Sequence, residues 1–285
     1  MIDATIRLVG QNGVTITLLD TAQDLMREPG GSGWGMVPVV NSWFEGAGDG
    51  AQLRGTRRTQ RELIIPISAF GMNRAGVEAQ LRKLVNTIHD PFRVFMDYAD
   101  GRSYYIDVVY DSGASGQYGA VPNRRAQMPI VLKSLSDPYW VSIQSQSFTV
   151  APGLGLPFLP ELAELHVSSS VAQGEVTITN IGDVASRPTW TIHGPGTGLS
   201  ILINGRGVVL ADYVFDSTTV VTIKYEDGGW LIEDQNGTNL YPELGDAPWF
   251  PEFPPGTSIV SVELADATSD TFIRAIYPER REVVY

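Results

Sequence analysis

The residues most suggestive of catalysis are four carboxylates near Trp230. Glu226 and Asp227 precede it, and Glu233 and Asp234 follow it. A pair of carboxylates that flanks a sugar can hydrolyse a glycosidic bond, one as general acid and the other as base or nucleophile. Residues 147–285 hold 18 Asp and Glu, so some of them must be near neighbours by chance. We therefore predict no catalytic pair and expect the chain not to be an enzyme.

Metal and cofactor sites have equally little support. The three histidines, His89, His166 and His193, lie far apart and in no paired spacing that would bind zinc. The glycine-rich residues 194–198 lack both the third glycine of a dinucleotide loop and the Gly-Lys-Ser/Thr ending of a phosphate loop, so they indicate a turn. The chain also has no cysteine. We predict no catalytic, cofactor or metal-binding residues.

Two kinds of residue suggest binding. Aromatic residues near the acidic cluster could form a platform for a carbohydrate, with Trp230 and Trp249 as the contact residues, although core packing explains them at least as well. Four arginines, Arg54, Arg57, Arg58 and Arg61, lie in or just after residues 45–60, which have no periodicity and are predicted to be a long loop. Long loops often bind partners, and arginine is enriched in interfaces, so subunit contact is favoured over nucleic acid.

Net charge divides the chain. Residues 1–146 hold 14 Lys and Arg and 14 Asp and Glu, a net charge of 14 − 14 = 0. Residues 147–285 hold 6 and 18, a net charge of 6 − 18 = −12. We predict two domains with these bounds. The field of the second would repel phosphate, which argues against DNA binding by that domain.

The first domain is predicted to be β-strands with one packed helix. Asn12-Gly13 and Asp100-Gly101 indicate hairpins that join residues 5–9 to 14–19 and 93–98 to 103–110. Further strands are expected at residues 36–44, 61–70 and 126–135, the second at an edge or bulge because of Pro66. Residues 111–125 read as a second long loop. A helix is expected between Asn73, a plausible N-cap, and Pro91, with apolar residues Val77, Leu81, Leu84, Val85 and Ile88 on one face.

The second domain is predicted to contain strands alone. A strand at residues 147–150 leads into residues 151–160, whose prolines and glycines forbid a regular element. Short strands then follow at even intervals, at residues 163–168, 174–180, 189–193, 199–203, 208–210, 220–225, 230–234, 258–265 and 271–277. This pattern is typical of a two-sheet β-sandwich or jelly roll.

Three parts of the sequence resemble the distal tail proteins, or minor tail proteins, of siphophages, especially those of actinobacterial hosts. They are the order of hairpin, loop, strand, helix and hairpin up to residue 111; the strand that ends in Asp137-Pro138-Tyr139-Trp140; and residues 178–196, with an Asn-Gly turn, a proline strand and a glycine turn. The resemblance implies a mainly β fold: an N-terminal split β-barrel of tail-tube type with one packed α-helix, and a C-terminal galectin-like sandwich.

It also implies a structural role. Proteins of this family form a hexameric ring at the tail tip that joins the tail tube to baseplate or fibre proteins and lets DNA pass. The implied partners are further copies of the chain, the tail tube protein, the tail-associated hub protein and the tape measure protein, assembled in the host cytoplasm. The alternative is a carbohydrate-binding adhesin that recognises a host cell-wall glycan. We expect no membrane span and no secretory leader, since no long apolar stretch occurs.

Overall fold

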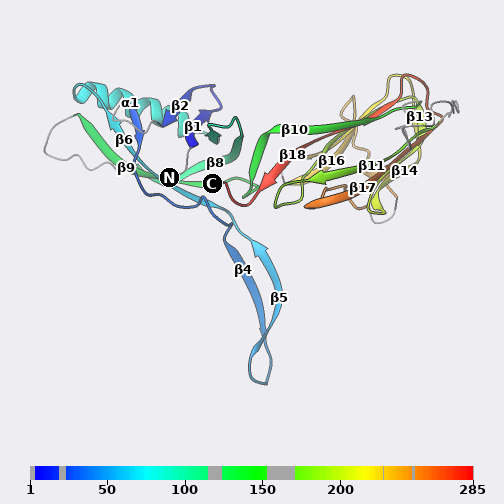
Figure 1. The fold of residues 1–285 in the computed structure, drawn as a ribbon, viewed down its shortest axis with the longest axis horizontal. Coiled ribbons are helices and arrows are strands. Elements are labelled where there is room, and N and C mark those ends of the chain that lie inside the picture. The colour runs from blue at the N-terminus through cyan, green and yellow to red at the C-terminus, as the bar shows by residue number, and fades with distance from the viewer. Residues whose placement is uncertain are drawn as a thin grey trace. The chain divides into compact units, whose positions relative to one another are not determined.

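The computed structural model describes residues 4–18, 24–114, 124–152, 171–226, 228–245 and 248–284. The chain forms two compact units, unit 1 comprising Met1–Ile143 and Arg281–Tyr285, and unit 2 comprising Gln144–Arg280. Each unit has its own apolar core. The predicted fold class, mainly β with one helix in the first part and a sandwich in the second, is confirmed (Figure 1). The division predicted at 146/147 did not include the last residues, Arg281–Tyr285, in the first unit.

Unit 1 contains a seven-stranded antiparallel sheet in the order β2-β1-β7-β8-β9-β6-β3. Among the described residues, the terminal strands β2 and β3 do not pair with each other, so the barrel is split. The strands are β1 (Ala4–Gly10), β2 (Thr15–Leu18), β3 (Leu25–Arg27), β6 (Glu62–Phe70), β7 (Phe92–Tyr98), β8 (Ser103–Gly113) and β9 (Arg125–Ser134). Both predicted hairpins, β1–β2 and β7–β8, are confirmed.

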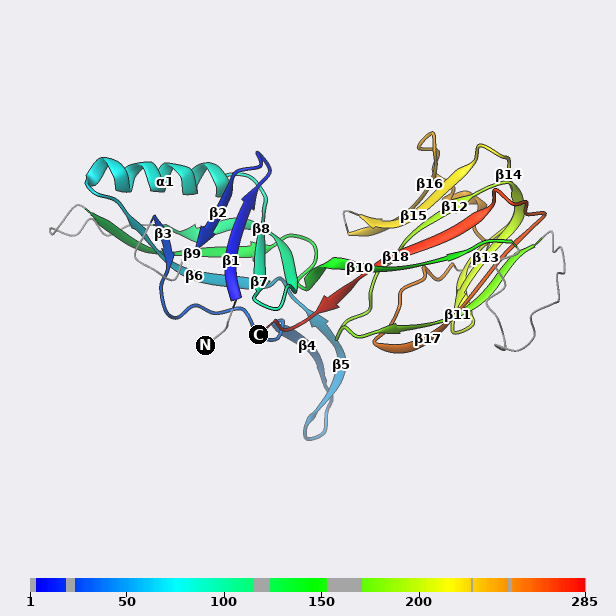
Figure 2. The ribbon, with the colours of Figure 1, turned by 45° about the horizontal axis from the view of Figure 1, so that its top comes forward.

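The helix α1 (Arg74–Ile88) packs on β6, β1 and β2 and lies over one face of this sheet (Figure 2). Asn73 caps it, because its side-chain oxygen accepts a hydrogen bond of 3.0 Å from the amide of Gly76. The predicted apolar face holds at Val77, Leu84 and Ile88, which are buried. Val85 is exposed instead, since it lies at the margin of the stripe.

Two predictions for unit 1 are wrong. Residues 45–60 are not a loop, because β4 (Val39–Glu45) and β5 (Ala51–Arg58) pair from end to end around a glycine-rich turn, with one β-bulge between Ser42 and Trp43. β6 is not an edge strand either, since it pairs with both β3 and β9. Its ladder with β3 ends at Ile67, so Pro66 lies just beyond the paired residues on that side, while on the other side it pairs with Pro129 of β9. Of the predicted loop 111–125, residues 111–113 continue β8, and most of the remainder lies outside the described residues.

Unit 2 is a sandwich of two antiparallel sheets, ordered β16-β15-β12-β18-β10 and β11-β17-β13-β14. The strands are β10 (Trp140–Val150), β11 (Ala172–Asn180), β12 (Thr189–His193), β13 (Gly196–Ile203), β14 (Arg206–Phe215), β15 (Val220–Glu226), β16 (Gly229–Asp234), β17 (Gly256–Ala265) and β18 (Phe272–Arg281). A 3-10 helix, η1, spans Tyr241–Glu243. Trp190, Phe215 and Phe253 are fully buried between the sheets. The predicted strand 163–168 lies outside the described residues, as does Asp227.

Candidate functional site: an exposed hairpin and its base

The β4–β5 hairpin is a two-stranded ribbon that stands clear of the other strands of unit 1 (Figure 1). Every residue of both strands is exposed, including five large apolar side chains. Their exposed fractions are 42% for Val39, 52% for Val40, 57% for Trp43, 45% for Phe44 and 54% for Leu53. An isolated two-stranded hairpin is at best marginally stable in water, and monomers rarely display contiguous apolar surface without a partner.

Few contacts within the hairpin compensate for this exposure. The guanidinium of Arg54 lies 4.3 Å from the centre of the Phe44 ring, a cation–π contact. The hydroxyl of Thr56 donates a hydrogen bond of 2.9 Å to the side-chain oxygen of Asn41 on the opposite strand. Arg57 lies directly opposite Val40 and is exposed. The middle and tip of the hairpin are therefore available to a partner.

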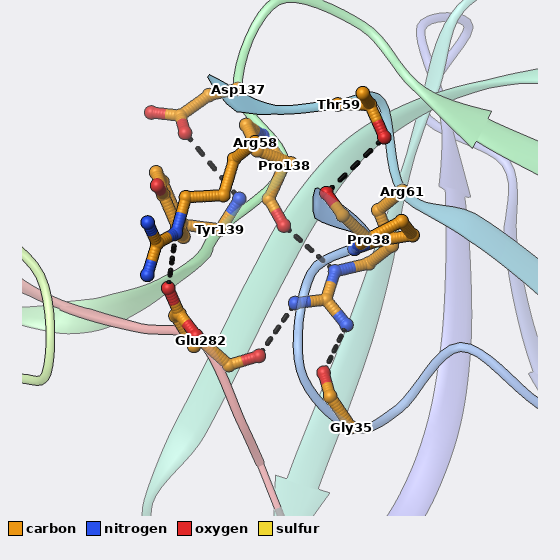
Figure 3. Close-up of polar contacts among 9 residues, drawn as sticks. All are labelled: Gly35, Pro38, Arg58, Thr59, Arg61, Asp137, Pro138, Tyr139 and Glu282. Atoms are coloured by element: carbon orange, nitrogen blue, oxygen red, sulfur yellow. Dashed lines mark hydrogen bonds and ion pairs between the residues drawn. The ribbon is translucent and has the colours of Figure 1, made fainter. Parts of the chain in front are cut away.

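The base of the hairpin is fastened by a buried arginine. The guanidinium of Arg61 donates hydrogen bonds to the backbone oxygens of Pro138 at 2.7 Å, Gly35 at 2.6 Å and Glu282 at 2.5 Å (Figure 3). It also donates to the backbone oxygen of Gly33. Burial lowers the pKa of Arg61 to about 10, so the side chain is still a cation at neutral pH. It joins the segment before β4, the strand β6 that follows the hairpin, the segment before β10 and the C-terminal residues.

A second arginine secures the same base from the surface. Arg58 donates a hydrogen bond of 2.7 Å to the carboxylate of Glu282, which raises the pKa of Arg58 (Figure 3). Thr59 donates to the backbone oxygen of Pro38 through its amide, at 2.9 Å, and through its hydroxyl, at 3.2 Å. The base of the hairpin is thus fixed by contacts of the residues next to both of its strands and by Glu282 near the end of the chain.

Of the four arginines predicted to contact other subunits, the structure separates one from the rest. Arg61 is fully buried and holds backbone oxygens of its own chain, so its prediction as an interface residue is wrong. Arg54, Arg57 and Arg58 lie together on β5 and are exposed. The sequence reasoning missed Trp43, Phe44 and Leu53. The signal that could have found them is the adjacent apolar pairs Val39-Val40 and Trp43-Phe44 beside a segment rich in glycine and arginine.

The two tryptophans predicted to contact carbohydrate differ in environment. Trp230 is half-buried, because Phe250 stacks on it with ring centres 5.3 Å apart and Tyr225 meets it edge-on at 5.6 Å. Trp249 is 59% exposed, and the guanidinium of Arg206 lies 5.7 Å from its ring centre. Trp249 is therefore the one of the pair with a ring open to a ligand.

The described carboxylates near Trp230 have structural partners. The ammonium of Lys224 lies 2.8 Å from a carboxylate oxygen of Glu226 and 3.2 Å from one of Glu233. Asp234 accepts backbone hydrogen bonds of 2.8 Å from both Thr238 and Asn236, and these contacts hold the pKa of Asp234 below its ordinary value. Because one ammonium joins Glu226 to Glu233 and Asp234 closes a turn, this arrangement stabilises the β15–β16 hairpin.

His193 stacks on Phe272 with ring centres 5.1 Å apart, and His166 lies outside the described residues. Within the described ranges, no group of three or more His, Asp or Glu side chains is arranged to hold a metal ion. No helix in those ranges is both long and apolar enough to cross a membrane.

The fold is similar to that of a phage tail protein of known structure. The crystal structure of the SPP1 Dit (gp 19.1) protein, presented as a paradigm of the hub adsorption apparatus in phages that infect Gram-positive bacteria, aligns with a TM-score of 0.64 and 14% sequence identity. The alignment covers 96% of this chain and 98% of that chain. At this identity the likeness establishes a Dit-like fold across both units.

Two further structures align at lower similarity. Both are of the phage P2 baseplate in its activated conformation. The structure with calcium has a TM-score of 0.49, and its alignment covers 100% of both chains. The structure with strontium has a TM-score of 0.48, its alignment covers 99% of both chains, and the sequence identity is 10% in each case. No protein-family model and no curated protein matches the sequence.

Proposed function

We propose that this chain is the distal tail protein of a long-tailed bacteriophage, a structural tail-tip hub without enzymatic activity. The observation that carries the proposal is the alignment with SPP1 Dit, which includes both units and nearly the full length of both chains. A shared single domain would leave the role of the other open, whereas here the whole two-unit design is shared. In this role the chain forms a ring that joins the tail tube to baseplate or tail fibre proteins, with DNA passing through the lumen.

The hairpin gives this ring a physical basis. A ring built head to tail needs two different surfaces on each subunit, one of which reaches the neighbour. The β4–β5 hairpin offers free strand edges, exposed apolar side chains and the cations Arg54, Arg57 and Arg58. We assign it the contact with a neighbouring subunit. The proposed partners are five further copies in a hexamer, the tail tube protein, the tail-associated hub protein and the tape measure protein.

The location of the protein in a virion tests the proposal. An antibody fragment raised against unit 2 should label purified phage particles at the tip of the tail, and mass spectrometry of purified tails should contain the chain. A fragment raised against the major tail tube protein, which should label the length of the tail, is the control. Labelling along the tube or absence from purified tails would remove the hub assignment. Detection of the chain in the tails of phages that infect actinobacteria would support the resemblance to distal tail proteins of that host group.

A second candidate function rests on one observation, the exposure of Trp249 beside Arg206. An open indole ring next to a hydrogen-bond donor can bind a sugar of a host cell-wall glycan. If unit 2 binds such a glycan, Trp249→Ala should abolish retention of the intact protein on isolated host cell walls. Trp230→Phe, which keeps an aromatic ring in the stack with Phe250, should leave retention unchanged. Equal retention of the unmodified protein, Trp249→Ala and Trp230→Phe would exclude this role for Trp249.

A further inference from the structure

The apolar residues of the hairpin point in two directions. Side chains alternate between the two faces of a strand, and residues paired across an antiparallel ladder share a face. Val39 and Trp43 therefore lie on one face. Leu53, which pairs with Trp43 beyond a β-bulge, lies on it too, as does Arg58, which pairs with Val39 at the base and binds Glu282 of its own chain. We call this the Trp43 face. Val40 and Phe44 lie on the opposite face, which we call the Phe44 face.

A hairpin laid on a single surface has one apolar and one polar face, because only one face leaves water. Here both faces carry large apolar side chains, and the exposed fractions are similar, at 42% and 57% for Val39 and Trp43 against 52% and 45% for Val40 and Phe44. Adjacent apolar pairs in a strand are typical of burial on both sides. The pattern therefore indicates two covering surfaces rather than one.

Charge indicates what covers the Phe44 face. Arg57 pairs with Val40 on this face, and Arg54 reaches over the ring of Phe44. Such a face matches an acidic surface. Residues 147–285 of the chain itself have a net negative charge, with 18 Asp and Glu against 6 Lys and Arg. A second copy of the chain therefore has the charge that complements this face.

We propose that the β4–β5 hairpin is an interposed arm, buried on both faces between other copies of this chain. The Trp43 face packs on an apolar surface, and the Phe44 face packs on a surface rich in carboxylates. This inference rests on the proposed function, in which the chain forms a ring. It adds that the arm is covered on both faces and does not lie on the outer surface of one neighbour.

The absence of cysteine makes a direct test possible, because any introduced thiol is the only one in the chain. Val39→Cys and Val40→Cys are matched variants, adjacent in sequence and on opposite faces, each replacing a half-exposed valine. Each purified variant is separated into assembled and monomeric fractions by size. The rate at which a maleimide reagent labels the thiol is then measured in both fractions, so every variant serves as its own control.

Both thiols should react at least about tenfold more slowly in the assembled fraction, because labelling then requires a local opening of the contact. Protection of only one thiol would overturn the interposed arm while leaving the hairpin as a one-sided ring contact. Protection of neither would remove the hairpin from the interface altogether. If Val40→Cys became protected only in complete tails, its covering surface would belong to another tail protein, and the assignment to a second copy would fail.

Discussion

The buried guanidinium of Arg61 allows the most quantitative test of how the candidate interface is supported. Arg61→Met keeps most of the side-chain volume but leaves the backbone oxygens of Pro138, Gly33, Gly35 and Glu282 without this donor. A buried acceptor without a partner costs about 1 to 3 kcal/mol. The variant also avoids the desolvation of a cation, which offsets part of this sum. We expect unit 1 to lose about 3 kcal/mol of unfolding free energy.

Hydrogen exchange followed by mass spectrometry is the suitable assay, because peptides from the two units report their stabilities separately. A loss of about 3 kcal/mol corresponds to exchange of the slowest unit 1 amides that is faster by about two orders of magnitude. Unit 2 peptides should be unchanged. Arg61→Lys, which keeps the charge but not the planar array of donors, should recover only part of the loss.

Arg57→Met is the matched control, since it makes the same substitution at an exposed residue four positions earlier on β5. In the unassembled chain it should alter stability by no more than about 0.5 kcal/mol. If Arg61→Met were as harmless as Arg57→Met, Arg61 would not support the base of the hairpin. The same holds if the unit 2 amides exchanged faster to the same extent.

Three further predictions concern other parts of the structure. Replacing Asn73 with Ala should cost about 1 kcal/mol in the exchange of α1 amides, because the amide of Gly76 loses its cap, and an unchanged rate would contradict that role. Burial opposes ionisation of Asp97, but hydrogen bonds from Arg7 and Ser103 outweigh it and hold its pKa below the ordinary value, so its stabilisation is present above the unfolded pKa and is lost as pH falls through the folded pKa. Asp97→Asn should therefore make acid unfolding of unit 1 less steep, which a pH titration by circular dichroism would detect and an unaltered profile would disprove. Trp43→Ser should weaken ring assembly at least about tenfold, with Thr56→Ser on the same hairpin as control, and equal assembly of the two would exclude a contact through Trp43.

Local signals in the sequence were sufficient for much of unit 1. Asn12-Gly13 and Asp100-Gly101 provide residues suited to tight turns, and Gly13 and Gly101 have positive φ of 77° and 87°. The helix was predictable because its cap, Asn73, and its apolar stripe are both encoded within one segment. These elements depend on interactions between residues that are near in sequence, which is why spacing and residue type reveal them.

The candidate site was less predictable, because its contacts join distant residues. The strands β4 and β5 lack the alternation of buried and exposed residues that marks most strands, since both faces are exposed in the single chain. Arg61 resembles its neighbour Arg58 in sequence, but its partners are backbone oxygens as far away as Glu282, which no residue type indicates. Position in the fold, rather than residue type, separates the arginine that builds the base from those that are exposed.

Whether the chain forms a ring is decided by the molar mass of the purified intact chain, measured by light scattering over a range of concentrations. Six copies of the 31.0 kDa chain make a ring of about 186 kDa, if the sixfold closure that the resemblance implies holds. We predict a concentration-dependent shift from the monomer to a closed species of about that mass, with rings visible in electron micrographs, and loss of this species when residues 40–57 are replaced by a short glycine linker. A chain that stays at 31.0 kDa at every concentration and yields no rings on isolated tails would not be a ring-forming hub.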